Sequence, residues 1–157
     1  MGNAPSLTVR SLRCIMCFYG DKENMSTTSE KYGSIAVSYA KELIKTKQSP
    51  SNDGWEKIAR SVFTGNSLVE KGCPKGCFLG ICEEGLITGI PRGKYTNSKK
   101  NKAYGIYAIK ILRENDEYKN QPEKLWEKIP GAPKTYNHQM HVVCALWKAG
   151  LISKAEQ

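Results

Sequence analysis

The most unusual chemistry in the sequence lies between Gly85 and Arg113, where seven lysines and arginines occur without any aspartate or glutamate. Three of them, Lys99, Lys100 and Lys102, fall where a helix is expected to begin. A helix N-terminus carries a partial positive charge and unpaired N–H groups, so acidic residues are usual there. Lysines at this position therefore indicate a site for an anion, which the ammonium groups and the helix N–H groups would bind together.

The loop before this helix can extend the same site. Arg92 brings a guanidinium fork, Lys94 a second cation, and Tyr95 a ring able to stack on a base. Tyr95 and Thr88 exclude a Walker phosphate loop, because they stand where that motif requires Ser or Thr and its first Gly. The alternative interpretation is a solvated lysine face that only keeps the protein soluble. The predicted anion-binding residues are Arg92, Lys94, Tyr95, Lys99, Lys100 and Lys102.

Four cysteines beyond residue 70 raise the question of a metal. Cys73, Cys77 and Cys82 are closely spaced, and Cys144 would join them if their two helices pack together. Four thiolates can hold zinc. Cysteine is equally a common small core residue on apolar helix faces, and we expect that role here, with no metal and no other cofactor.

His138 and His141 lie one helical turn apart, a spacing that can hold a metal or flank a pocket. Ordinary surface histidines are the alternative. The chain shows no paired-carboxylate signature and no nucleophile-elbow context. The sequence therefore leans against an enzyme, predicts no catalytic residue, and leaves activity undecided.

Residues 1–25 show no sustained helical or strand period, and we expect them to be a disordered or incidental leader. The segment Met1-Gly2-Asn3-Ala4-Pro5-Ser6 fits an N-myristoylation pattern. The pair Cys14-x-x-Cys17 has the spacing of zinc ribbons and thioredoxin-like motifs, but no second such pair follows.

From Tyr32 to Ile44 the apolar residues recur every three or four positions, which predicts an amphipathic helix beginning near Ser26. Similar patterns predict helices over about 51–63, 74–84, 98–113 and 137–149, with a short turn after Pro122. Gly65 is placed as the left-handed residue that ends the second helix. The inner face of the 98–113 helix is predicted to carry Ala103, Ile106, Tyr107 and Ile111.

These elements predict an all-α fold, a compact bundle of five or six short helices. We expect one helical domain over residues 26–152 and a C-terminal tail over 153–157. The brief β-like run from Gly85 to Ile90 is too short to carry a sheet.

Composition and charge narrow the class of partner and the location that we expect for this protein. The 157 residues carry a formal net charge of +9, which favours an anionic partner such as nucleic acid. No apolar stretch approaches the roughly 20 residues of a membrane span. Six cysteines without a recognisable signal peptide favour a cytoplasmic location.

Three stretches carry a resemblance: Lys71 to Gly85, Ser98 to Tyr104, and Gln139-Met140 with Ala145-Leu146-Trp147. On these residues the chain resembles a small uncharacterised bacterial family of the kind encoded in mobile DNA, including integron gene cassettes. The resemblance covers roughly residues 28 to 152. It implies a compact helical cytoplasmic protein and supplies no activity.

The leading hypothesis is a non-enzymatic basic helical module that contacts nucleic-acid phosphates, or another anion, through residues 92–110. Tyr95, Tyr104 and Tyr107 are candidate stacking rings, although Tyr107 is expected to pack inward. A second hypothesis is a self-associating, dimeric protein that binds a small molecule or partner protein. A third is a small enzyme on an anionic substrate with His138 or His141 as acid or base. The second hypothesis relies on Trp55, Trp126 and Trp147.

Overall fold

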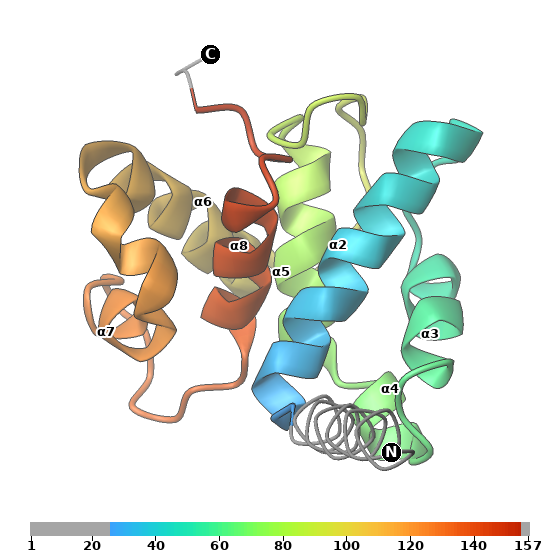
Figure 1. Cartoon of the computed structure of the whole chain (residues 1–157), viewed down its shortest axis with the longest axis horizontal. Helices are drawn as coiled ribbons and strands as arrows, with labels where there is room; N and C mark the ends of the chain where they lie inside the picture. Colours follow the sequence, from blue (N-terminus) through green and yellow to red (C-terminus); the bar gives the residue numbers. More distant parts are fainter. Residues whose placement is uncertain (1–25, 155–157) are drawn as a thin grey trace, which may run out of the picture.

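A computed structural model describes residues 26–154, and in this range the chain folds as helices joined by loops, of which the longest runs over residues 84–98 (Figure 1). The predicted all-α bundle is confirmed. A four-residue helix α4 (Asn66–Val69) and a 3-10 helix η1 (Asp116–Asn120) accompany the longer helices. The longer helices are α2 (Thr28–Thr46), α3 (Asn52–Arg60), α5 (Gly72–Glu83), α6 (Lys99–Glu114), α7 (Pro122–Glu127) and α8 (Gln139–Lys148).

Pairing between extended segments in residues 26–154 is limited to one isolated antiparallel bridge, between Ile87 and Ile152. No helix of this range is long and apolar enough to cross a bilayer. The patterns noted at Gly2, Cys14 and Cys17 lie outside the described residues, as do positions 155–157 of the expected tail.

Helix α2 starts where its capping residues predict. The Thr27 hydroxyl accepts the backbone N–H of Glu30 at 3.2 Å, and the Glu30 carboxylate accepts the N–H of Thr27 at 2.9 Å. This reciprocal pair satisfies two of the N–H groups that a helix start leaves unpaired. The helix ends at Thr46, and the following cap residue, Lys47, adopts a left-handed conformation with φ 61°.

The second predicted helix is shorter than its apolar pattern. The Ser51 hydroxyl accepts the N–H of Gly54 at 3.0 Å and starts α3, which ends at Arg60. The prediction of a left-handed Gly65 is wrong: its φ is −96°, because it precedes the short helix α4 as its N-cap. Val62, which lies within the predicted helix over 51–63, is 38 % exposed and follows the end of α3.

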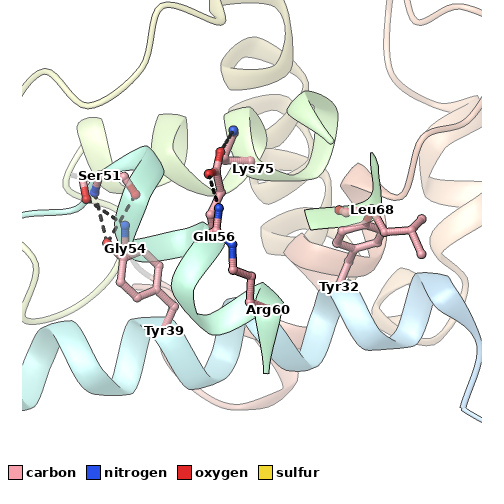
Figure 2. A network of polar contacts seen from close by, with 8 residues as sticks. All are labelled: Tyr32, Tyr39, Ser51, Gly54, Glu56, Arg60, Leu68 and Lys75. Carbon is pink, nitrogen blue, oxygen red and sulfur yellow. Dashed lines mark hydrogen bonds and ion pairs between the residues drawn. The ribbon is translucent and has the colours of Figure 1, made fainter. Parts of the chain in front are cut away.

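Two tyrosines of α2 fasten this part of the chain to the bundle (Figure 2). The Tyr32 hydroxyl donates to the carbonyl of Leu68 at 2.6 Å, and the Tyr39 hydroxyl accepts the N–H of Ser51 at 3.1 Å. Figure 2 also shows Glu56 of α3 paired with Lys75 of α5 at 2.7 Å. Because both tyrosine rings are buried, these contacts fix the approach of α3 and α4 to α2.

Helix α8 is the centre of the core. It packs against α2, α5, α6 and α7, and Figure 1 shows it between α2 and α7. The apolar periodicity of the sequence turns Met140, Val143, Cys144 and Trp147 inward, and all four are buried, as is Leu146. Its start differs from the prediction, because His138 adopts a left-handed conformation with φ 71° and the helix begins at Gln139.

The inner face predicted for α6 is partly wrong: Ala103 and Tyr107 are exposed, whereas Ile106 and Ile111 are half-buried against the core. Its buried residues are Gly105, Ala108, Ile109 and Leu112, whereas Tyr107 is 43 % exposed. Glycines set this rotation, because a Cβ on Gly105 would lie 2.9 Å from the Sγ of Cys77. Helix α6 therefore turns its glycine toward α5 and its Tyr107 ring toward solvent.

Candidate functional site

The first turn of α6 divides into an inward and an outward half. The Asn101 side-chain N–H donates to the Ser98 hydroxyl at 2.8 Å, and Asn101 Oδ1 accepts from the buried Gln139 amide of α8 at 3.0 Å. Ser98 provides no side-chain cap for the helix N–H groups. Asn101 therefore serves the packing of α6 on α8.

Lys102 also points into the fold. Its ammonium lies 2.8 Å from Glu83 and 2.6 Å from Glu84, both at the end of α5. The approach depends on Gly80, whose Cβ would stand 2.6 Å from the Lys102 Cα. These carboxylates raise the pKa of Lys102, with Glu83 the largest cause. The predicted anion-binding lysine therefore already has two anionic partners within the chain.

The carboxylate of Glu83 lies beside Lys102 and the loop before α6, where the sequence predicted a bound anion. Besides Lys102, its carboxylate accepts the backbone N–H groups of Tyr95 and Thr96, at 2.9 and 3.1 Å. The hydrogen bond from Lys102 is the largest cause that lowers the pKa of Glu83, to about 2, and the two N–H groups add to it. Sequence reasoning missed this role, and the only signal was the position of Glu83-Glu84 directly before the acid-free segment.

Of the three candidate stacking rings, Tyr95 and Tyr104 pack within the fold, whereas Tyr107, which was expected to pack inward, is exposed. The Tyr95 hydroxyl donates to the Pro91 carbonyl at 2.7 Å, and its ring lies against Gly93. Tyr104 packs edge-on against Trp126, with ring centroids 5.1 Å apart. Tyr107 is the ring of the three that α6 exposes.

The outward face of α6 remains strongly basic. Lys99, Lys100 and Lys110 are exposed, and within residues 26–154 none of them forms an ion pair. Lys100 and Tyr107 are seven residues apart, so they lie on one stripe about 10 Å apart along the helix axis. Arg92 and Lys94 are exposed in the preceding loop and likewise lack an ion pair in that range. The basic surface therefore differs from the predicted set of residues: Lys102 does not belong to it, whereas Tyr107 and Lys110 do.

A cleft of about 500 Å³ opens beside this face. Its cations come from the loop and from the first turn of α6, and its apolar floor comes from the second turn of α6. The lining residues are Glu83, Lys94, Thr96, Asn97, Lys99, Lys102, Ala103 and Ile106. Positive charge around an apolar floor can hold a phosphate beside a base or sugar.

A second cleft, of about 840 Å³, lies on the part of α8 between α2 and the η1–α7 segment. Figure 1 shows α2 and α7 on either side of α8. The cleft holds His141 and Lys148 from α8, Glu30 from α2, and Glu123 from α7. From the sequence, only the two histidines were candidates to flank a pocket, and of these His141 lines the cleft. The other walls could not be predicted, because they are far apart in the chain.

His141 is half-buried and held in one orientation. The Tyr136 hydroxyl accepts the backbone N–H of His141 at 2.8 Å and lies 2.6 Å from its Nδ1. Burial lowers the pKa of His141, although the charges of Glu123 and Glu30 oppose this shift. Burial also raises the pKa of Tyr136, so the phenol stays protonated and the imidazole neutral near neutral pH.

His138 is used differently. Its Nδ1 lies 2.7 Å from the Ser29 hydroxyl, and its ring packs on Tyr32 with centroids 5.0 Å apart. Burial lowers its pKa. The ring therefore fastens the start of α8 to α2, and His138 does not line the larger cleft.

The four cysteines lie mostly in the core. The Cys77 thiol lies 3.8 Å from the Gln139 carbonyl, and the Cys144 thiol 3.7 Å from the Tyr118 carbonyl. Burial raises the pKa of Cys144 to about 12 and also raises that of Cys77 and Cys82, which keeps these thiols protonated. Residues 26–154 contain no group of three or more His, Cys, Asp or Glu side chains placed to hold a metal.

The side chains of all three tryptophans are also buried in the core. Trp55 has no exposed surface, Trp126 is 5 % exposed and Trp147 is 4 % exposed. They are therefore unavailable to the interface that the second hypothesis built from them.

Comparison with known proteins gives a family and no activity. No curated protein and no solved structure matches the chain. A family model described as a family of unknown function (DUF6979) matches residues 29–153, nearly the whole described helical region. The chain therefore belongs to the family of unknown function DUF6979.

Proposed function

We propose that this protein binds single-stranded nucleic acid through the basic face of α6. The observation that carries the proposal is the exposed Tyr107 ring on the same helix face as Lys100 and Lys110, which have no ion pair among residues 26–154. Lysines that follow a backbone, with an aromatic ring on which a base stacks, are the usual elements of sequence-tolerant single-strand binding.

The adjoining loop and cleft extend this surface. Arg92, Lys94 and Lys99 add phosphate contacts, and the apolar floor formed by Ala103 and Ile106 suits a sugar or base. Lys102 and Tyr95 keep this region in shape through Glu83 and take no direct part. Such contacts give salt-dependent affinity without base specificity.

The test is a titration of labelled single-stranded DNA and RNA at two salt concentrations, with double-stranded forms alongside. Replacing Lys94, Lys99 and Lys100 by Gln should weaken binding and reduce the salt slope by up to about 2, because each single-strand contact contributes about 0.7. The matched control replaces the exposed Lys41, Lys45 and Lys57 of α2 and α3 and should retain the slope. Equal affinity of the two triple variants would overturn the proposal.

Tyr107 supplies a second, charge-independent test. Tyr107→Leu should weaken single-strand binding by about 1–3 kcal/mol, the usual worth of one base stacked on an aromatic ring. Tyr107→Phe retains the ring and should bind as the parent does. Identical losses in both variants would exclude stacking as the role of Tyr107.

Three narrower proposals accompany this function. The resemblance supports an origin in mobile DNA such as an integron cassette. Cysteine usage supports a cytoplasmic location. Self-association as a homodimer would have to use residues other than the buried tryptophans, and light scattering across a concentration series tests it.

A further inference from the structure

The cleft on α8 contains a hydrogen-bond donor whose direction is fixed. The Tyr136 phenol accepts the His141 backbone N–H, so its single proton is left for the His141 Nδ1 at 2.6 Å. Nδ1 is then an acceptor, and the neutral ring carries its proton on Nε2. Among the described residues no partner bonds to this Nε2–H. His141 therefore offers a donor to whatever enters the cleft.

The charged residues of the cleft differ in what already binds them. Glu30 is held by the N–H of Thr27, and Lys119 pairs with Asp116 at 2.8 Å. Glu123 and Lys148 are exposed, and within residues 26–154 neither forms an ion pair, with each other or with any other residue.

Glu123 and Lys148 nevertheless act on the same residues of the cleft. Both charges influence the pKa of His141 and the pKa of Cys144, in opposite directions. Both side chains line the cleft, Glu123 from α7 and Lys148 from α8, and among the described residues they form no ion pair with each other. A bound dianion would be repelled by Glu30 and Glu123, and a simple cation by Lys148, whereas a ligand carrying both signs is attracted at each end.

We propose that this cleft binds a small zwitterion, an amino acid or short peptide, with its ammonium group at Glu123 and its carboxylate at Lys148 and the Nε2–H of His141. The volume of about 840 Å³ lies in the range of small-molecule sites. The exposed hydroxyls of Ser34 and Ser38 on α2 line the same cleft and supply further hydrogen bonds. The site is separate from the basic face of α6 and does not depend on nucleic-acid binding.

The experiment follows the ring signals of His141 by NMR at neutral pH, with His138 in the same spectrum as internal reference. The probes are the common L-amino acids and glycyl dipeptides, each added free, N-acetylated and C-amidated, together with inorganic phosphate alone. We expect saturable shifts at His141 with at least one free zwitterion. Its two blocked forms should each bind about two- to fivefold more weakly, the usual worth of an exposed ion pair.

Two single-residue variants test which side chain binds each end of the zwitterion. Glu123→Gln should remove the advantage of the free over the N-acetylated probe, and Lys148→Gln the advantage of the free over the amidated probe. Glu127→Gln and Lys128→Gln are the matched controls, because both residues are exposed at the end of α7 and neither lines the cleft. The proposal is overturned if no zwitterion shifts His141, if blocked and free forms bind equally, or if phosphate alone reproduces the shifts.

Discussion

The basic face of α6 and the histidine cleft on α8 are built in opposite ways. The first draws its cations from one short stretch of chain, and apart from Lys102 these lysines are exposed and form no ion pair among the described residues. The second draws single residues from α2, α7 and α8, and its His141 is half-buried with both its N–H and its Nδ1 engaged. A high local density of charge is visible in a sequence, whereas an oriented donor exists only after packing.

Each region depends on a close helix crossing at which a glycine is required. Gly80 lets α6 approach α5, where a Cβ would stand 2.4 Å from the Lys102 Cβ. Gly33 lets α2 approach α8, where a Cβ would stand 2.9 Å from the Ala145 Cβ and 3.0 Å from the His141 carbonyl oxygen. Substituting each glycine therefore disturbs one region and leaves the other in place.

The largest effect is expected for Gly80→Ala. The added methyl group meets the backbone of Lys102, so α6 must move, and overpacking of this kind costs about 1–3 kcal/mol of unfolding free energy. Thermal denaturation should show the loss, and single-strand binding should fall while the His141 ring signals stay unchanged. Gly72→Ala is the control, because a Cβ there meets nothing within 4 Å. A Gly80 variant as stable as this control would contradict the close approach of α5 and α6.

Gly33→Ala should give the reverse pattern at somewhat lower cost. The new methyl group meets one side-chain carbon and one carbonyl oxygen, so we expect a loss of about 1–2 kcal/mol. The ring signals of His141 should shift, and zwitterion binding should weaken. Nucleic-acid affinity should stay at the parental value. If both glycine variants changed both binding activities equally, the two regions would not be independent.

Glu83→Gln tests the internal anion beneath the basic face. The pKa of Glu83 is about 2 in the folded protein, below the ordinary value of 4.5, so the unfolded chain binds more protons between these limits. Its stabilisation is present above about pH 4.5 and is lost as the pH falls toward 2. The variant should be about 1–2 kcal/mol less stable at neutral pH and should lose less stability on acidification.

Glu84→Gln is the comparison for this prediction. Its side chain is 37 % exposed, and within residues 26–154 its carboxylate forms an ion pair only with Lys102, so its removal should cost less than that of Glu83. Denaturant titrations of the three proteins at neutral pH and near pH 3 measure both effects. Parallel pH profiles of the parent and the Glu83 variant would show that Glu83 is not the anion that organises the loop.

Tyr136→Phe should have the smallest effect on stability, about 1 kcal/mol, because the His141 N–H loses its acceptor at a partly solvated helix start. The ring nitrogen shifts of His141 should show the Nε2–H form in the parent and a mixture of forms in the variant. His138, held by Ser29, should not change. A parent that carries its proton on Nδ1 would remove the donor from the proposed zwitterion site.

Burial lowers the pKa of both histidines, and the stability of the protein therefore depends on pH near and below 6.5. A lowered pKa means that the folded state binds fewer protons than the unfolded state just below pH 6.5. The stability contributed by the neutral rings is therefore present above pH 6.5 and is lost as the pH falls below it. For His141 the groups that set this balance are Glu123, Glu30 and Lys148, together with its bond to Tyr136.

Local signals in the sequence located most helices correctly. The capping residues Thr27 and Ser51 begin α2 and α3, and Gly85 and Gly150, with φ of 69° and 72°, end α5 and α8. These features are readable because each depends on neighbouring residues alone. The end of α3 and the rotation of α6 were not readable, because α4 and the glycine contacts with α5 decide them.

The candidate site shows the same division. The sequence by itself determined that residues 85–113 are basic and free of acids, that a helix occupies the second half of this stretch, and that the helices have the apolar faces of a bundle. Only the tertiary structure decided that Lys102 is neutralised by Glu83, that Tyr107 is exposed, and that His141 lines a cleft. The physical reason is range: caps and helical periods act within a few residues, whereas ion pairs and clefts join residues that only packing brings together.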